Sequence, residues 1–384
     1  MLRNRFVKTA TYEGFYLNGL PTEALTEHHA RLARGGIGMT TVSYGAVNNI
    51  GRTHAHQMIV DERSRPHLEK LTRAVKKERA AISIQLTHCG FFSSNVTIKG
   101  QNPLAPSKTL NLYGLLQGLA FSKSMSTGDI EQTGDDFARA ALVAKEAGFD
   151  AVEIHMGHGY LLSQFISPFT NKRKDHYGGS LENRMRFPLE VVQKVRNEVG
   201  EGYPILCKIN LSDGFKGGLV LRESIEVAKY LEAAGVNALV LSGGFTSRTP
   251  FYLMRGGIPV KDMIKVEKDK LQKLALLLFG RFIIKRYTFE ENFFLPMARK
   301  LRTQVKIPLV YLGGVTSTAG ISKVMTEGFE LMAIGRSLIH DPDFILKVRE
   351  TNYTSPCDHC NKCVPEMDRE GIRCVLNTPE RHPG

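Results

Sequence analysis

The chain has 384 residues, 42% of them hydrophobic, and carries a formal net charge of +13. This length suits one elaborated domain as well as two ordinary ones, so it does not decide the domain count. The positive charges are spread out and do not alternate with aromatic residues, which argues against a nucleic-acid surface. No uninterrupted apolar run reaches the ~18 residues of a membrane helix, and the first residues lack the apolar core of a secretory signal. Six cysteines in so long a chain are typical of a reducing compartment, and we predict a cytoplasmic protein.

Short apolar runs alternate with helical patterns along most of the chain. Eight of these runs are predicted strands, at residues 4–7, 37–43, 81–86, 151–154, 204–210, 238–242, 308–312 and 331–334. Helices are predicted between them, over residues 22–33, 68–79, 135–148, 184–199 and 222–234. Thr22 is the predicted N-cap of the first helix. The alternation predicts an α/β protein in which eight parallel strands form a (β/α)8 TIM barrel.

Two long connections interrupt this alternation. Residues 93–128 lack clean periodicity and contain Gly, Pro, Asn and Ser, so we expect a long loop that roofs the substrate pocket. Residues 245–295 are predicted to be an inserted subdomain or lid, with an amphipathic region at 265–285. That region is also compatible with a membrane-surface helix, but no second anchor accompanies it. We therefore assign residues 1–350, insertion included, to the barrel, and residues 351–384 to a C-terminal tail rich in cysteine.

Polar side chains that can do chemistry follow the fourth predicted strand. His155, His158 and Tyr160 lie within six residues, with Gly157 and Gly159 between them. Glycine lets the backbone turn tightly, so all three side chains can be aimed at one place. Two imidazoles can hold one oxygen atom, and a phenol beside them can donate a proton. A lone histidine on a loop is more often an ordinary polar residue, but three such groups together predict a catalytic site.

The same stretch is part of a longer signature. Residues 155–187 read HMGHGYLLSQFISPFTNKRKDHYGGSLENRMRF, and residues 85–90 read QLTHCG. Both segments resemble the Old Yellow Enzyme family of FMN-dependent NADH:flavin oxidoreductases, which is related to the barrel domain of 2,4-dienoyl-CoA reductase. The resemblance extends from Asn4 to about Cys374, and it implies a TIM barrel that binds FMN and takes hydride from NADH or NADPH. The chain begins almost at the first strand, whereas family members usually carry a further stretch that closes the barrel floor.

The resemblance also implies a cofactor site. In the family, a hydroxyl at the position of Thr11 can bond near flavin O4, and Gln85 pairs with the pyrimidine edge of the flavin. Lys208 interrupts an apolar strand and takes the place of an arginine beside flavin N1 and O2, where a cation stabilises the reduced ring. The loops after the last two strands of a barrel frequently bind phosphate, through backbone N–H groups and a cation. The expected phosphate residues are Gly313, Gly314, Gly335 and Arg336.

The implied reaction is the reduction of an activated C=C bond, such as that of an α,β-unsaturated carbonyl compound. His155 and His158 would hold the carbonyl oxygen and stabilise its developing charge, while Tyr160 would protonate the α-carbon. One alternative is a dienoyl-CoA-reductase-like or amine-oxidising flavoprotein with a [4Fe-4S] cluster. Another is a flavin-binding sensor that does not turn over. The expected partners are small molecules, with no nucleic acid and no membrane. A homo-oligomer is compatible with the sequence, which fixes neither the substrate nor the choice of NADH or NADPH.

The tail carries a separate pattern, C-x2-C-x2-C-x10-C, formed by Cys357, Cys360, Cys363 and Cys374. Four thiolates so spaced can hold an iron-sulfur cluster or zinc. Multidomain relatives, such as the 2,4-dienoyl-CoA reductases and trimethylamine dehydrogenase, hold a four-iron cluster with a slightly wider run. Because the chain stops at Gly384, before any domain that would exchange electrons with a cluster, we favour unligated thiols and assign no metal ligand.

Overall fold

The computed structural model describes residues 2–98, 100–267 and 269–377. Eight strands close into a barrel in the order β1-β12-β11-β10-β9-β8-β5-β4, and every neighbouring pair is parallel. They are β1 (Phe6–Lys8), β4 (Met39–Ala46), β5 (Ala81–Thr87), β8 (Ala151–Met156), β9 (Ile205–Asn210), β10 (Ala238–Ser242), β11 (Leu309–Leu312) and β12 (Leu331–Ile334). The predicted (β/α)8 barrel is confirmed, and each predicted apolar run contributes one of these strands.

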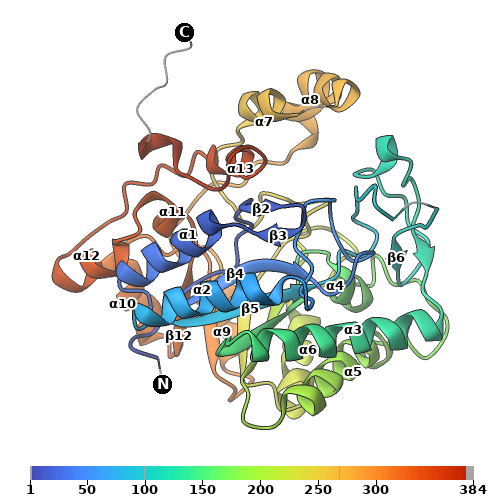
Figure 1. The fold of residues 1–384 in the computed structure, drawn as a ribbon, viewed down its shortest axis with the longest axis horizontal. Helices are drawn as coiled ribbons and strands as arrows, with labels where there is room; N and C mark the ends of the chain where they lie inside the picture. The colour runs from blue at the N-terminus through green and yellow to red at the C-terminus, as the bar shows by residue number, and fades with distance from the viewer. Residues whose placement is uncertain (1, 99, 268, 378–384) are drawn as a thin grey trace.

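Helices cover the outside of this barrel (Figure 1). The longer ones are α1 (Glu23–Arg34), α2 (Arg65–Lys77), α3 (Thr127–Glu146), α5 (Leu181–Val199), α6 (Leu221–Ala233), α9 (Leu295–Arg302), α10 (Thr318–Thr326) and α12 (Phe344–Glu350). Shorter segments are α4 (Leu161–Ile166), α11 (Arg336–His340), α13 (Cys363–Glu366), η1 (Leu115–Gln117) and η2 (Val375–Asn377). Two small sheets lie outside the barrel, formed by β2 (Tyr16–Leu17) with β3 (Leu20–Pro21) and by β6 (Leu104–Ala105) with β7 (Lys123–Ser124).

A side-chain capping bond explains where α3 begins, but none is made at the start of α1. α3 starts well before residue 135, because the Ser126 hydroxyl accepts the N–H of Asp129 and the Asp129 carboxylate accepts the N–H of Ser126. Thr22 occupies the N-cap position of α1, but its hydroxyl donates to the carbonyl oxygen of Phe15 and makes no capping bond. Thr22 is therefore the N-cap as predicted, but its hydroxyl holds the preceding segment and makes no capping bond.

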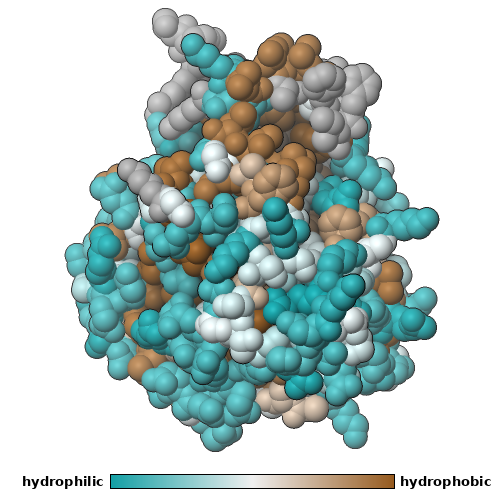
Figure 2. Space-filling view, turned by 90° about the vertical axis from the view of Figure 1, so that its right-hand side faces the viewer, coloured by the Kyte–Doolittle hydropathy of each residue, from teal (hydrophilic) through white to brown (hydrophobic). Residues whose placement is uncertain are grey.

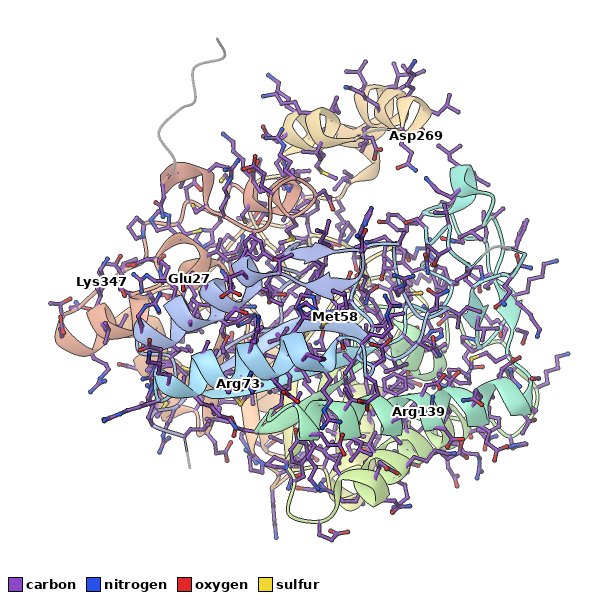
Figure 3. All side chains as sticks on the ribbon, in the orientation of Figure 1. Glu27, Met58, Arg73, Arg139, Asp269 and Lys347 are labelled. Atoms are coloured by element: carbon purple, nitrogen blue, oxygen red, sulfur yellow. The ribbon has the colours of Figure 1, made fainter. Side chains whose placement is uncertain are left out.

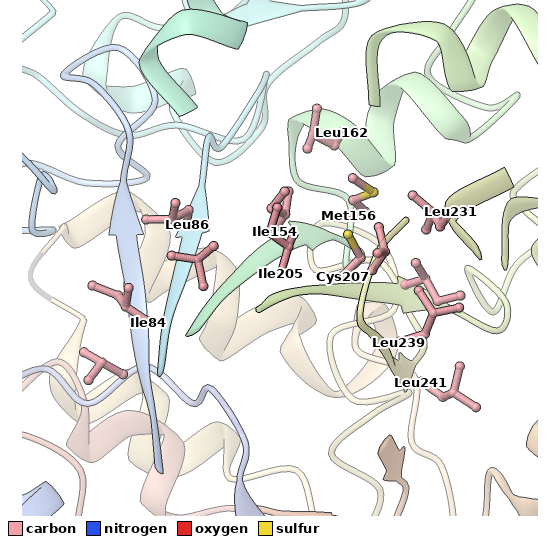
Figure 4. Packing of buried hydrophobic residues seen from close by; sticks show 14 of the residues in the cluster. Ile84, Leu86, Ile154, Met156, Leu162, Ile205, Cys207, Leu231, Leu239 and Leu241 are labelled. Carbon is pink, nitrogen blue, oxygen red and sulfur yellow. The ribbon is translucent and has the colours of Figure 1, made fainter. Parts of the chain in front are cut away.

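The strands are buried on both faces because their side chains alternate between the barrel interior and the helix layer. Leu239 and Leu241 of β10 pack with residues of the surrounding helices (Figure 4). Ala238 and Val240 belong to a separate cluster, drawn from the barrel strands, that fills the interior. Nearer the C-terminal ends of β8 and β9, the positions in step with this interior cluster are polar: Glu153, His155 and Lys208. The interior thus changes from apolar to polar toward one end of the barrel.

The insertion after β10 contains two helices, α7 (Val260–Val266) and α8 (Lys270–Ile283), that project from the barrel (Figures 1 and 3). α8 begins there because the Asp269 carboxylate accepts the N–H groups of Leu271 and Gln272. The predicted amphipathic region at 265–285 is thus divided between two helices. Figure 2 shows apolar residues gathered over this projecting part, where α8 exposes Leu271, Leu274, Leu277 and Leu278. None of the helices in the described part of the chain is long and apolar enough to cross a membrane.

Candidate active site

A cavity of about 1070 Å³ opens at the C-terminal ends of the barrel strands, where barrel enzymes keep their active sites. This volume exceeds the ~1,000 Å³ at the upper end of ordinary small-molecule pockets, so a cofactor and a second molecule can share it. The predicted site residues that line it are Thr11, Gln85, His155, His158, Tyr160, Lys208, Gly314, Gly335 and Arg336. Gly313 is not among the residues that line it, and a Cβ atom placed there would lie 2.9 Å from Phe294 and from the Tyr311 hydroxyl. Its phosphate contact stays a prediction.

His155, His158 and Tyr160 converge at the end of β8. The ring centre of His155 lies 4.9 Å from that of His158 and 4.6 Å from that of Tyr160. The chain reverses sharply here, with a φ of 59° at His158 and 78° at Gly159. A Cβ atom at Gly159 would lie 2.5 Å from the ring of Phe245, so only glycine fits this turn.

Both histidines are neutral in this environment. Burial, followed by the charges of His158 and Lys208, holds the pKa of His155 well below its ordinary value. Burial likewise lowers the pKa of His158 to about 3. His158 Nε2 lies 2.7 Å from the Ser242 hydroxyl, whereas His155 Nδ1 is buried with no hydrogen-bond partner among the described residues. A buried ring nitrogen left in this way indicates that a polar ligand atom completes the site.

Tyr160 is held as a proton donor. Burial raises its pKa further above the ordinary value, and hydrogen bonds with Tyr44 and Thr53 oppose part of that rise. The two tyrosine rings lie with their centres 5.5 Å apart, edge to face. At neutral pH the phenol of Tyr160 is therefore protonated, with a second hydroxyl positioned to stabilise the phenolate after proton transfer.

A buried polar network joins the neighbouring strands β5, β8 and β9. Glu153 Oε1 accepts a hydrogen bond of 2.6 Å from the amide nitrogen of Gln85 and forms an ion pair of 2.9 Å with Lys208. The Lys208 ammonium also donates to the hydroxyl of Thr9 over 3.2 Å. Because the Glu153 carboxylate accepts from the amide nitrogen of Gln85, it fixes the orientation of that side-chain amide. Lys208 thus has the partner that a buried lysine requires.

Glu153 was not predicted from the sequence, although a signal for it exists. It lies two residues before His155 on the same strand, so both side chains point to the barrel interior. Pairing of β8 with β9 then brings the Glu153 carboxylate within reach of Lys208. Other residues that line the cavity without having been predicted are Tyr44, which lies in β4, and Thr53 and Arg248, which lie in loops.

The other end of the cavity is formed by the loops after β11 and β12, where Gly314, Gly335 and Arg336 lie together. The Arg336 guanidinium donates to the backbone oxygen of Arg255 over 2.7 Å and to Asn361 Oδ1 over 2.8 Å. These contacts orient the side chain and leave it without a carboxylate partner among the described residues, which suits a phosphate ligand.

The donor and acceptor groups of the cavity fit FMN. The cation and glycines at one end suit a phosphate, while the amide and ammonium groups of Gln85 and Lys208 suit the pyrimidine edge of a flavin. Thr11 lines the cavity between these two regions of the barrel end, after β1. The orphaned nitrogen of His155 lies where a second ligand would complete its hydrogen bonding.

The four tail cysteines surround a small second cavity that Arg336 also lines. Burial raises the pKa of each of these four thiols, that of Cys363 to about 12. Cys374 Sγ lies 3.2 Å from His340 Nδ1. Within the residues that the structure describes, no group of three or more His, Cys, Asp or Glu side chains is arranged to hold a metal ion. The choice between a cluster, zinc and unligated thiols stays a prediction.

Comparison with known proteins identifies the family. The model of the NADH:flavin oxidoreductase / NADH oxidase family matches residues 1–245. A 4,4'-dithiodibutanoate disulfide reductase of Rhodococcus erythropolis is 40% identical over 379 residues, covering 98% of this chain and 92% of the relative. An NADPH dehydrogenase of Bacillus subtilis is 30% identical over 351 residues, covering 89% of each chain.

The fold is shared with solved structures. The structure of a 2-naphthoyl-CoA reductase in complex with 2-naphthoyl-CoA matches 98% of this chain with a TM-score of 0.82 and 25% identity, and this chain spans about half of it, 55%. The resemblance inferred from the two sequence signatures is confirmed, and FMN and NAD(P)H are the cofactors that the family uses. The chain belongs to the NADH:flavin oxidoreductase / NADH oxidase family.

Proposed function

We propose that this oxidoreductase uses NAD(P)H to reduce a C=C bond activated by a neighbouring carbonyl group. The observation that supports the proposal most directly is the convergence of two neutral imidazoles and a protonated phenol, His155, His158 and Tyr160, on one cavity. Neutral imidazoles can donate hydrogen bonds to a carbonyl oxygen, and the phenol can supply a proton.

We propose that the cofactor is held by Thr11, Gln85, Lys208, Gly314, Gly335 and Arg336. When bound, FMN supplies the hydride chemistry, accepting hydride from the nicotinamide and delivering it to the second substrate. Arg336 and the two glycines would bind the phosphate, and Gln85 would bind the pyrimidine edge. The Lys208 ammonium, paired with Glu153, would stabilise negative charge on the reduced ring.

The protein's own contribution to the second half-reaction is positional and electrostatic. His155 and His158 would donate hydrogen bonds to the carbonyl oxygen of the acceptor, and these bonds strengthen as negative charge develops on that oxygen. Tyr160 would then give its proton to the α-carbon. The hydrogen bond with Tyr44 would stabilise the resulting phenolate until solvent returns the proton.

The substitution Tyr160→Phe tests this assignment. It removes the acid without removing the ring, so reoxidation by cyclohexenone should slow by about 100-fold or more, the usual contribution of a general acid. Reduction by NADPH should stay within about twofold of the unmodified enzyme, because the phenol takes no part in it. Tyr177→Phe is the matched control, since Tyr177 is buried away from the cavity and bonded to Glu190. Equal losses in both half-reactions, measured by anaerobic stopped-flow absorbance, would contradict the role of Tyr160.

Reduction of a disulfide is a second candidate, supported by the 40% identity to the 4,4'-dithiodibutanoate disulfide reductase. Two electrons and two protons would convert one disulfide to two thiols, with the same side chains near the sulfur atoms. Mixing the NADPH-reduced enzyme anaerobically with 4,4'-dithiodibutanoate and with cyclohexenone separates the two proposals. The faster reoxidant, compared at equal concentration, identifies the preferred acceptor class.

The remaining alternatives also have direct readouts. A dienoyl-CoA-reductase-like or amine-oxidising enzyme with a [4Fe-4S] cluster predicts iron and acid-labile sulfide in purified protein, bound through the tail cysteines. A sensor that does not turn over predicts flavin reduction by NADPH with no acceptor able to reverse it. We propose a cytoplasmic enzyme, because six cysteines in so long a chain do not form a small disulfide scaffold, and cell fractionation tests that location.

A further inference from the structure

An aromatic wall forms one side of the cavity beside the histidines. It consists of Phe91, Phe169 and Phe245. The ring centre of Phe245 lies 6.4 Å from that of Phe91 and 6.5 Å from that of Phe169. Phe245 is held beside the turn at His158 and Gly159, here called the catalytic turn. The N–H of the next residue, Thr246, donates to the carbonyl oxygen of His158 over 2.9 Å. A flat apolar molecule held at His158 can therefore extend along this wall.

A cation stands at the far end of the aromatic wall. The guanidinium carbon of Arg248 lies 4.3 Å from the ring centre of Phe169 and 5.0 Å from that of Phe215, and the residue lines the same cavity. Stacking on two rings fixes the plane of a guanidinium while leaving its N–H groups free to donate. Arg248 is solvent-exposed and, among the residues that the structure describes, makes no ion pair and no side-chain hydrogen bond.

The backbone that carries Arg248 is firmly held. The hydroxyl of Thr249 accepts the N–H of Phe245 and donates to the carbonyl oxygen of the buried Asp213, over 2.8 and 2.9 Å. The N–H of Arg248 donates to the carbonyl oxygen of Phe245 over 2.9 Å. A cation on such a turn is positioned before any ligand arrives, so little ordering cost accompanies binding.

The other cations that line the cavity differ from Arg248. Lys208 is paired with Glu153, and Arg336 is bonded to Arg255 and Asn361 at the end assigned to the phosphate. The N–H groups of Arg248 are thus free to bind a ligand. Arg248 lies on the side of the catalytic turn that faces away from the phosphate end. A guanidinium fork is matched by an oxyanion such as a carboxylate.

We propose that Arg248 binds a carboxylate of the electron-accepting substrate, whose planar apolar body lies against the aromatic wall while its polar end meets His155 and His158. The inference rests on the proposed function, because it assigns the ligand of the same histidine pair. It names the substrate class as a flat, monoanionic or dianionic molecule with its charge remote from the reacting bond. The phosphates of NAD(P)H are the competing oxyanions, and the test below separates them from a substrate carboxylate.

The test uses the oxidised FMN holoenzyme and two probes, 4-hydroxycinnamate and its methyl ester, titrated by calorimetry. The phenol end suits the histidine pair, and only the acid carries an anion. Arg248→Gln should weaken binding of the acid by about tenfold or more, the usual effect of losing a hydrogen bond to a charged group, and binding of the ester by less than about twofold. Arg248→Lys should recover part of the affinity for the acid, because it restores the charge without the fork.

Lys172→Gln is the matched control. The Lys172 ammonium lies 6.0 Å from the ring centre of Phe169 and does not line the cavity, so both affinities should stay unchanged. Equal weakening of acid and ester by Arg248→Gln, or no weakening, would overturn the proposal. A loss confined to NADPH binding, measured from the concentration dependence of flavin reduction, would assign the cation to the nicotinamide and would also overturn it. The calorimetric arm needs no turnover, so failure of enone reduction is recognised separately by stopped-flow.

Discussion

The buried ion pair beneath the cofactor site gives the sharpest prediction. Glu153 and Lys208 side chains are 3% and 1% exposed, and the carboxylate is also the hydrogen-bond acceptor of Gln85. Glu153→Gln preserves the shape and an oxygen acceptor but removes the negative charge. Lys208 would then keep only neutral acceptors, the amide oxygen at position 153 and the hydroxyl of Thr9 3.2 Å away, with the Lys8 ammonium nearby. Breaking one partner of a buried pair costs about 3–5 kcal/mol, so we expect the free energy of unfolding to fall by about 3 kcal/mol.

The assay is urea unfolding of the FMN-free protein followed by far-UV circular dichroism, because the chain contains no tryptophan. Adding Lys208→Met to Glu153→Gln removes the unpaired cation, so the double variant should regain about 2 kcal/mol. Glu226→Gln is the control. Its pair with Lys229 is half exposed on α6, and its loss should cost less than about 0.5 kcal/mol. If Glu153→Gln lowers the free energy of unfolding by less than about 1 kcal/mol, or if Lys208→Met restores none of the loss, the buried ion pair does not stabilise the fold in this way.

Two further predictions concern the cavity. The rate of flavin reoxidation by an enone should not change from about pH 5 to about pH 9. Burial keeps the pKa of His155 and His158 below this range and the pKa of Tyr160 above it. A break in the stopped-flow rates near pH 6.5 would show a titrating imidazole and contradict this. Arg336→Met should weaken FMN binding about tenfold or more and leave riboflavin binding unchanged, as read by fluorescence titration, since only FMN carries the phosphate. Arg299→Met, at an exposed pair on α9, is its control, and equal losses for both flavins would contradict the phosphate assignment.

The barrel was predictable because parallel strands covered on both faces produce short apolar runs, as in β9 and β10. The boundaries were less predictable, since α3 begins at a capping box that the apolar period does not reveal. The site was predictable where the family signature is local, as at His155 and Tyr160. Glu153 was missed because the role of its carboxylate depends on Lys208 on the neighbouring strand. The two residues come close only when the strands β8 and β9 pair.

Arg248 and the tyrosine behind Tyr160 illustrate the other kind of miss. Arg248 lies in a loop whose conformation is set by contacts distant in sequence, such as the hydrogen bond between Thr249 and Asp213, whereas Tyr44 lies in β4 and meets Tyr160 only through the barrel fold. The glycine pair after β11 is a weaker signal. Two adjacent glycines there predict two phosphate contacts, and of the two only Gly314 lines the cavity, so the contact of Gly313 stays a prediction. A glycine pair in a sequence does not reveal which member faces a ligand.

Asn361 in the tail has a consequence for engineering. Its side chain donates to the carbonyl oxygens of Met254 and Gly257 and accepts from Arg336. The side-chain amide of Asn361, a residue that is 1% exposed, therefore connects the start of the insertion to the proposed phosphate end. A barrel shortened at residue 350 would lose these hydrogen bonds along with the cysteines, even though all eight strands would remain. The smallest portable unit of this enzyme therefore includes the tail, and grafts of the insertion between relatives need to carry their own counterpart of Asn361.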